Sequence, residues 1–155
     1  MPETNVYQKQ SVMPTTMARM IAFHEDPRAI NRLTPPPIFV QLLRDDRKSF
    51  KDGELVFRLW LGPVPVQWVA RHEPGPTATS FADRMLQGPL ASWEHQHIFQ
   101  QTEQGVLLID HITFAHKPGI AGLLSRLVFD GISLRLLFIY RHWQTRRTLE
   151  GVLEA

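Results

Sequence analysis

The sequence contains no cysteine, and that absence excludes several kinds of site at once. A chain without thiols has no disulfide framework, no thiolate nucleophile and no cysteine-based zinc site. There is also no run of 18 or more apolar residues, because Arg126, Asp130 and Arg135 interrupt the most hydrophobic segment. The first twelve residues lack the apolar core of a signal peptide. These features predict a soluble, cytoplasmic protein with no stable membrane insertion.

An excess of charge of one sign is missing as well. The formal net charge is +2, which is too small to indicate a nucleic-acid partner. The local basic cluster of Arg141, Arg146 and Arg147 suits the C-terminal end of a helix. We therefore expect no nucleic-acid binding. With 155 residues, 43% hydrophobic and 21% charged, the chain is most simply one globular domain spanning residues 1–155.

Alternation of apolar and polar residues dominates the chain from Ile38 to Ala115. Turns containing Gly or Pro divide this part into segments of strand length. Short strands at such spacing are typical of an antiparallel meander. A separate segment, residues 5–12, alternates well enough for one more edge strand. The expected sheet therefore has about seven strands, six of them in the meander: residues 37–44, 54–61, 64–73, 77–87, 91–101 and 106–115.

Helical spacing lies on both sides of the meander. Before it, a threonine at 15 or 16 can cap a short helix, and Asp26-Pro27 can start a second one that ends at Leu33. After it, residues 120–149 fit one helix of about 45 Å, with Gly131 as the position for a bend or a close contact. A curved sheet must bury one face, and a long helix is the simplest cover. The sequence thus predicts an α+β fold in which the sheet wraps around a C-terminal helix.

This long helix is apolar on two opposite sides, and a helix of that kind is normally sandwiched between other elements. Two alternatives remain for the second side. Either the short N-terminal helices cover it, or Phe129, Leu136 and Trp143 form a homodimer seam. The first stripe comprises Ile120, Leu123, Leu124, Leu127, Leu134 and Phe138, and the second comprises Phe129, Ile132, Leu136, Ile139, Tyr140 and Trp143.

Ionisable side chains interrupt the buried face of the meander. Successive strand residues point to opposite faces, so counting by two places imidazoles and carboxylates among aromatic rings. His111 falls on the other face by the same count. Buried ionisable groups are costly unless they are paired, and this favours a cavity with a chemical purpose. The residues expected on the buried face are Phe81, Asp83, Met85, Trp93, His95, His97, Phe99, Asp110, Ile112 and Phe114.

Metal binding is one interpretation of these residues. His95 and His97 lie two apart on a strand, so their Cα atoms are roughly 6.5 Å apart on one face. They could share a zinc ion, with Asp83 or Asp110 as a third ligand. Carboxylates and histidines in a half-buried sheet also satisfy each other through charge-assisted hydrogen bonds. We favour this second interpretation and expect no metal and no cofactor.

A spaced set of residues accompanies this order of elements: Leu33-Thr34-Pro35-Pro36, Gly62-Pro63, Phe81-Ala82-Asp83, Gly88-Pro89, residues 93–99, Asp110, Phe138 and Arg141. The set resembles the SRPBCC superfamily of START-like and pollen-allergen-like helix-grip proteins. Within it, the chain is similar to the bacterial polyketide cyclase/dehydrase-like or cell-division-inhibitor-like subgroup. The resemblance covers nearly the whole chain. It implies a helix-grip fold with a central void, but not an activity, because one fold hosts many functions.

Two functions follow as expectations. We favour a cavity between the sheet and the C-terminal helix that binds a hydrophobic or amphipathic small molecule, such as a lipid, polyketide or quinone-like compound, for transport or sequestration. The alternative is a cyclase- or dehydratase-like enzyme in which a His–Asp pair abstracts a proton alpha to a carbonyl. Its candidate catalytic residues are His95, His97, Asp83 and Asp110. The candidate ligand-binding residues are Trp68, Phe81, Asp83, Trp93, His95, His97, Phe99, Phe114 and Phe138.

Overall fold

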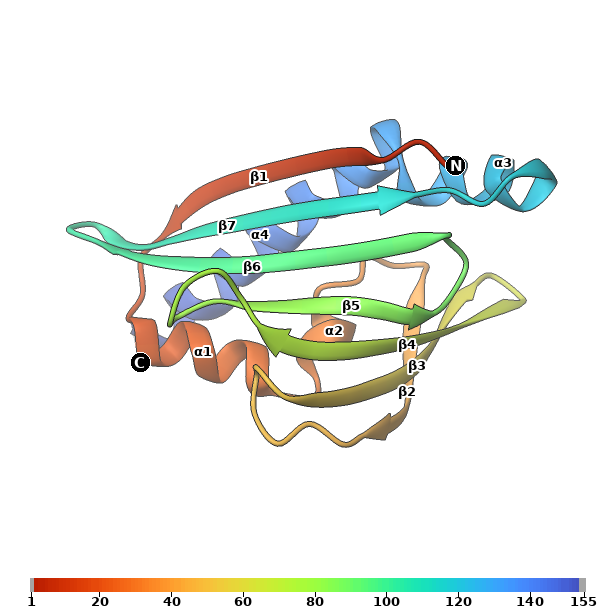
Figure 1. Cartoon of the computed structure of the whole chain (residues 1–155). Coiled ribbons are helices and arrows are strands. Elements are labelled where there is room, and N and C mark those ends of the chain that lie inside the picture. Colours follow the sequence, from red (N-terminus) through yellow and green to blue (C-terminus); the bar gives the residue numbers. More distant parts are fainter. Residues whose placement is uncertain (1, 154–155) are drawn as a thin grey trace.

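A curved antiparallel sheet of seven strands forms the centre of the computed structural model, which describes residues 2–153 (Figure 1). The spatial order is β1-β7-β6-β5-β4-β3-β2, so β2 to β7 form a meander and β1 pairs with its last strand. The predicted six-strand meander with one additional strand is therefore confirmed. The strands are β1 (Asn5–Met13), β2 (Phe39–Asp45), β3 (Gly53–Leu61), β4 (Val64–Pro74), β5 (Phe81–Gln87), β6 (Ser92–Thr102) and β7 (Gly105–Ala115).

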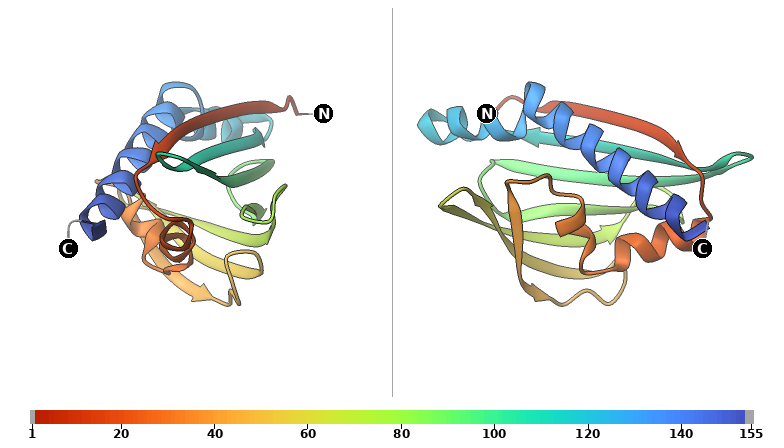
Figure 2. Two further views of the ribbon diagram at one scale, coloured as in Figure 1. Left: turned by 90° about the vertical axis from the view of Figure 1, so that its left-hand side faces the viewer. Right: turned by 180° about the vertical axis from the view of Figure 1, so that it is seen from behind.

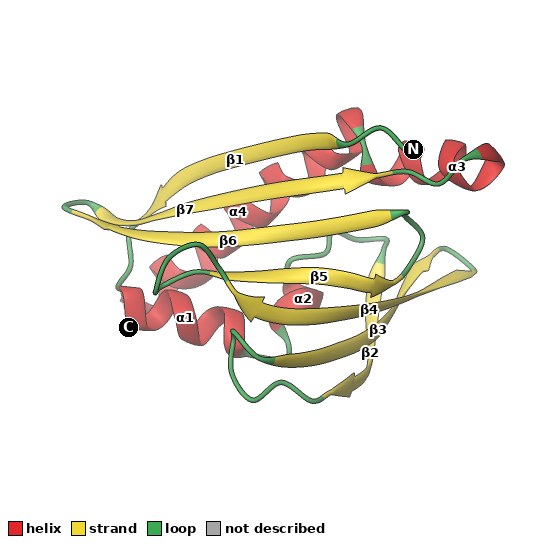
Figure 3. Ribbon diagram, in the orientation of Figure 1, coloured by secondary structure: helices red, strands yellow, loops and turns green. Residues whose placement is uncertain are grey.

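Two short helices follow β1, as the sequence predicted (Figure 3). Helix α1 is Met17–Glu25, and α2 is the single turn Ala29–Arg32. The Thr16 side chain caps α1 by accepting a hydrogen bond from the backbone N–H of Arg19 at 3.3 Å, which satisfies one of the free donors at the helix start. The connection Leu33–Ile38 contains three consecutive prolines and therefore cannot continue the helix.

The C-terminal region forms two helices, α3 (Gly119–Phe129) and α4 (Gly131–Leu153). Viewed along the sheet, the strands curl into a trough, and α4 runs diagonally across its open side (Figure 2). Helix α3 lies at the end of the sheet where β7 finishes. No helix within residues 2–153 is both long enough and apolar enough to span a membrane.

The division between α3 and α4 is sharper than the bend that the sequence allowed at Gly131. Asp130 leaves the helical conformation with φ −149° and ψ 168°, and Gly131 has φ +54°, a value that favours glycine. The Asp130 carboxylate accepts hydrogen bonds from the Gly131 N–H and from His116 Nε2, at 2.8 and 2.9 Å. His116 also contacts Ser125 Oγ through Nδ1, at 2.7 Å. These bonds hold the junction against the end of β7.

The expected first stripe of the helix is only partly buried, because α3 does not lie over the sheet. Leu134 and Phe138 on α4 are buried in the core. The α3 members are exposed instead, which corrects the expectation of a continuous inward stripe: Ile120, Leu123, Leu124 and Leu127.

The second stripe is also divided. Phe129 is buried in the core, packed against Trp68 and Trp93, and therefore cannot form part of a surface seam. Leu136 and Trp143 are exposed by 60% and 51%, so the short N-terminal helices do not cover them.

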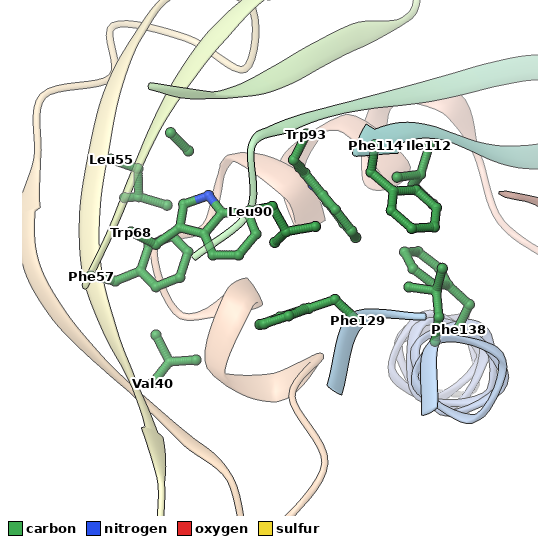
Figure 4. Close-up of a cluster of buried hydrophobic side chains, with 12 residues drawn as sticks. Val40, Leu55, Phe57, Trp68, Leu90, Trp93, Ile112, Phe114, Phe129 and Phe138 are labelled. Carbon is green, nitrogen blue, oxygen red and sulfur yellow. The ribbon is translucent and has the colours of Figure 1, made fainter. Parts of the chain in front are cut away.

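The interior contains two hydrophobic clusters at different levels along the strands. The aromatic cluster lies toward α3, and Figure 4 shows its side chains converging from the sheet and from both C-terminal helices. The methionine cluster lies at the opposite end, where α1 covers the sheet. The aromatic cluster comprises Val40, Leu55, Phe57, Trp68, Ala70, Leu90, Trp93, Ile112, Phe114, Phe129, Leu134 and Phe138. The methionine cluster comprises Met13, Met20, Phe23, Leu33, Phe81, Phe99, Val106, Leu108 and Leu149.

Candidate functional site

A layer of ionisable side chains separates the two clusters, and we call it the polar layer: Asp83, His95, His97, Asp110 and His142. Three strands and α4 supply it. On β6, for example, the inward positions run from Trp93 through the two histidines to Phe99. The predicted inward facing of these β6 residues is confirmed by their burial. His111 has the expected opposite orientation, and its Nδ1 contacts Gln8 on an exposed face, at 2.9 Å.

Strand register decides which groups of this layer meet. His95 pairs with Asp83 across β5–β6, and His97 pairs with Asp110 across β6–β7. The short contacts, however, run diagonally. His95 Nε2 lies 2.7 Å from Asp110 Oδ1, and His97 Nε2 lies 2.7 Å from Asp83 Oδ2. Diagonal neighbours in a sheet are within reach of long side chains, so each imidazole bridges two strands.

Asp110 extends the layer to the far side of the fold. Its Oδ2 lies 2.7 Å from His142 Nε2 on α4, and His142 Nδ1 lies 2.5 Å from Ser11 Oγ on β1. Asp110 and His142 are both 4% exposed, so these contacts are shielded from solvent. The sheet and its covering helix are thus joined by a continuous chain of hydrogen bonds.

One side of the polar layer opens into a cavity of about 350 Å³ between the sheet, α2 and the C-terminal helices. Exposed residues Pro27 and Leu127 are among its lining, so it reaches the surface beside α2. Most of its wall is apolar: Ala29, Ile30, Leu33, Leu55, Phe57, Leu59, Leu61, Trp68, Ala70, Phe81, Trp93, Val128, Phe129 and Leu137. Three members of the polar layer also line it: Asp83, His95 and His97.

The candidate ligand-binding residues fall into two groups in the structure. Three of them, Phe99, Phe114 and Phe138, are at most 2% exposed and do not line the cavity; they fill the core around it. The catalytic candidate Asp110 likewise lies behind the imidazoles rather than at the wall. The other six line the cavity: Trp68, Phe81, Asp83, Trp93, His95 and His97.

Several polar residues of the cavity wall were not predicted from the sequence, among them His24, His72 and Arg141. His72 had a usable signal, because it follows Trp68 and Ala70 on the same face of β4 and pairs with Asp83. It stacks on the Phe81 ring with centroids 5.1 Å apart, and Phe81 in turn stacks on His97 at 4.2 Å.

The other two residues approach from helices. His24 lies on the buried side of α1, and tertiary packing brings its ring to 5.5 Å from that of His97. Arg141 lies over the Phe138 ring, and its Nε donates to the Leu33 carbonyl at 3.2 Å. His142 was missed as well, although it continues the buried spacing of Leu134 and Phe138 on α4.

Both carboxylates of the polar layer are held in the ionised form. Burial alone would raise the pKa of Asp83, but the hydrogen bond from His97 and the nearby His95 outweigh it and lower the pKa. Burial likewise opposes ionisation of Asp110, whose bonds to His142 and His95 bring its pKa well below the usual range. Arg141 adds a buried positive charge nearby, although burial lowers its pKa.

Burial lowers the pKa of three histidines at the cavity and so favours their neutral form. Desolvation lowers the pKa of His24 to about 3, with His97 contributing in the same direction. Burial also lowers the pKa of His97, and the adjacent His95 adds to that shift. For His72 the same cause applies, and Asp83 only partly offsets it. Neutral imidazoles with free lone pairs at a cavity wall can accept protons or bind metal ions.

Comparisons with known proteins address the fold. No protein-family model matches the sequence, and no curated protein matches it. Solved structures do match. A START superfamily protein from Mycobacterium smegmatis has a TM-score of 0.67 at 10% identity, over 95% of this chain and 98% of that one. The Zhui aromatase/cyclase from Streptomyces has a TM-score of 0.64 at 14% identity, over 94% and 96%.

A plant protein gives the same result. The major latex-like protein of Panax ginseng has a TM-score of 0.67 at 10% identity and covers 94% of this chain and 97% of its own. The high coverage of both chains in each comparison shows that these structures share the overall fold of this chain. The chain has a START-like helix-grip fold, as its resemblance implied.

Proposed function

We propose that the protein binds a hydrophobic or amphipathic small molecule in the cavity between its sheet and its C-terminal helices, and transports or sequesters it. The observation that carries this proposal is the wall of the cavity. Aliphatic and aromatic side chains make up most of it, while Asp83, His95 and His97 form one polar end. Small-molecule sites typically combine apolar walls with a few polar groups that orient the ligand.

The volume favours a compact ligand. About 350 Å³ lies at the lower end of the ~300–1,000 Å³ range of small-molecule pockets. A ring system such as a polyketide or a quinone head group matches this space better than a long-chain lipid. The ligand's apolar part would pack against Trp68 and Leu59, and an oxygen would face the polar end.

Native mass spectrometry of untagged protein is the direct test, with the denatured mass as reference. A mass excess that passes into organic solvent would support a carrier and identify its ligand. Titration with an apolar fluorescent dye, anilinonaphthalene sulfonate, then tests the location. Leu59→Trp should fill the cavity and reduce dye affinity at least tenfold, whereas Leu136→Trp on the exposed face of α4 should not. Equal affinities in both variants would place binding elsewhere.

The polar end can be tested with the extracted ligand. His97→Ala removes one of its groups and should weaken binding by about two- to tenfold, the usual contribution of a hydrogen bond between neutral groups. His111→Ala is the matched control, since it removes an imidazole from the other face of the sheet. Equal losses in both variants would contradict the assigned orientation of the ligand.

A cyclase- or dehydratase-like enzyme is the second candidate, and the Asp–His contacts favour it. His97 faces the cavity with a depressed pKa and is oriented by Asp83. A neutral, oriented imidazole can act as a general base toward a proton alpha to a carbonyl. The Zhui protein with the same fold is an aromatase/cyclase. Turnover of a polyketone probe, with a pH–rate limb that His97→Ala abolishes, would support this role over simple transport.

A further inference from the structure

The polar end of the cavity contains more lone pairs than hydrogen-bond donors. A neutral imidazole has one N–H donor and one bare nitrogen, and an ionised carboxylate only accepts. Because His95 Nε2 lies 2.7 Å from Asp110 Oδ1, that nitrogen carries the proton. The Nδ1 lone pair of His95 then faces Asp83 Oδ2, 3.8 Å away, and makes no hydrogen bond to any residue among 2–153.

His97 shows the same conflict on both sides of its ring. Its Nε2 lies 2.7 Å from Asp83 Oδ2, and its Nδ1 lies 3.3 Å from Asp110 Oδ1. The Nδ1 is buried and has no hydrogen-bond partner within the described chain. If Nδ1 carries the proton, the Nε2 lone pair faces Asp83 Oδ2; if Nε2 carries it, the Nδ1 lone pair is buried without a donor, near Asp110 Oδ1.

Protonating both rings would remove the conflict but create another. The ring centroids of His95 and His97 are 3.7 Å apart in a stacked arrangement. Two positive charges at that separation repel, and both rings are at most 8% exposed, so solvent screens them little. A cation placed between the bare nitrogens and the carboxylate satisfies all three groups without charging either ring.

We propose that Asp83, His95 and His97 bind one divalent transition-metal ion at the polar end of the cavity. The ligands are an Asp83 carboxylate oxygen, His95 Nδ1 and His97 Nε2. Asp83 Oδ2 lies 3.8 Å from His95 Nδ1 and 2.7 Å from His97 Nε2, and atoms bonded to one ion at about 2 Å lie at most about 4 Å apart. Two imidazoles with one carboxylate suit ions such as Fe²⁺, Co²⁺ or Zn²⁺ and disfavour Mg²⁺ or Ca²⁺.

The groups behind these ligands support metal binding. With His97 Nε2 on the ion, its Nδ1 carries the proton and faces Asp110 Oδ1 at 3.3 Å, next to the His95 bond at 2.7 Å. One buried carboxylate thus orients the His95 ring and lies beside His97 Nδ1, and His142 holds its second oxygen at 2.7 Å. Histidine ligands characteristically direct their second nitrogen at such a carboxylate. The expected His–Asp pairs are present as diagonal contacts, and the proposal adds an ion that would bridge Asp83, His95 and His97.

The cavity gives the ion a function. All three ligands line it, whereas Asp110 and His142 do not. Three protein ligands leave coordination positions open, and these positions face the space available to a small molecule. The ion would therefore hold a water or polarise an oxygen of the ligand. The metal site itself does not depend on what fills the apolar part of the cavity.

Co²⁺ is the probe of choice, since its visible absorption reports on the coordination geometry. Full-length untagged protein, stripped with a chelator, is titrated with CoCl₂, and the bound ion is then displaced by Zn²⁺. We expect one ion per chain and absorption bands typical of a four- or five-coordinate site. Asp83→Asn and His95→Gln preserve side-chain size and should each lower affinity at least a hundredfold. Asp110→Asn should lower it about ten- to a hundredfold, as loss of an outer partner does.

His111→Ala is the matched control and should bind Co²⁺ as the wild type does. Far-UV circular dichroism and thermal unfolding identify any variant that fails to fold. If His95→Gln or Asp110→Asn fails to fold, Asp83→Asn is sufficient for the test. Absence of Co²⁺ bands at millimolar metal, or affinity unchanged in Asp83→Asn and His95→Gln, would overturn the proposal. So would imidazole ¹⁵N shifts showing both rings doubly protonated at pH 7 in the presence of Zn²⁺. None of these readouts requires a bound organic ligand, so the metal site and the proposed carrier function can fail separately.

Discussion

The two hydrophobic clusters on either side of the polar layer differ in how completely they are filled. The methionine cluster is closed by α1, and Met13, Met20 and Val106 have no exposed surface. The aromatic cluster contains larger side chains, yet partly buried Leu59, Val128 and Leu137 border a cavity there. Large rigid rings on a curved sheet leave gaps that flexible methionine side chains fill. The polar layer therefore rests on a solid core on one side and faces open space on the other.

Replacing Asp110, at the centre of the polar layer, should have the largest effect on the free energy of unfolding. Asp110→Ala leaves two buried imidazoles, His95 and His142, without their shared acceptor. Breaking buried charged pairs in this way typically costs about 3–5 kcal/mol. Urea unfolding in a chelator measures the free energy of unfolding. His111→Ala should change it by no more than about 0.5 kcal/mol, and a similar small change for Asp110→Ala would mean that the layer contributes little to stability.

The packing of the two clusters can be compared by making the same Leu→Ala change in each. Leu108→Ala creates a hole in the filled methionine cluster and should cost about 2–5 kcal/mol. Leu59→Ala enlarges a space that already exists, so it loses fewer contacts and should cost about 1 kcal/mol or less. Both values come from urea unfolding under the same conditions. Equal costs would show that the cavity is closed in solution and that the two clusters are packed alike.

Acid should lower the free energy of unfolding through His24, which lies beside the polar layer. The pKa of His24 is about 3 in the folded chain and near 6.5 when unfolded, so the unfolded state binds the proton first. The contribution of neutral His24 is complete above pH 6.5 and is lost as the pH falls toward 3. His24→Phe keeps a ring in place and removes the titration. Between pH 6.5 and 4.5, in a chelator, the variant should gain about 2 kcal/mol relative to wild type.

His97 and His72 shift in the same direction as His24, so the variant should still lose stability in acid, but less steeply. The free energy of unfolding, measured by urea at each half-unit of pH, gives the two slopes. Parallel slopes for the variant and the wild type would show that His24 titrates normally and is more hydrated than its packing indicates.

The smallest effect on stability belongs to the outer face of α4. Leu136→Glu replaces a residue that is 60% exposed and should change the free energy of unfolding by at most about 0.5 kcal/mol. If this face is a homodimer seam, one of the two alternatives for its apolar stripe, the same charge should convert a dimer to a monomer in light scattering. A monomeric wild type would rule out that seam, and a large loss of stability would show that Leu136 belongs to the interior.

The sequence was sufficient for the sheet and the facing of its residues. Strict alternation along β6 and β7 placed His95, His97 and Asp110 inside, because a strand has only two faces. It could not give the diagonal pairing, since that depends on ring orientation as well as register. His24 and Arg141 lie on helices, and the local sequence does not show how these helices pack on the sheet. The break at Asp130 was missed because its cause, buried His116, lies fourteen residues earlier in the chain.

The diagonal bonds also have a consequence for how the chain finds its fold. A sheet with only aliphatic residues inside tolerates a two-residue slip between strands, because every inward side chain stays inward. A two-residue slip of β6 along β7 would place His95 or Phe99, instead of His97, opposite Asp110, and the diagonal bond between His95 Nε2 and Asp110 Oδ1 would be lost. Losing a hydrogen bond between buried polar groups is unfavourable. The polar layer thus favours the native register of β6 and β7 over registers shifted by two residues.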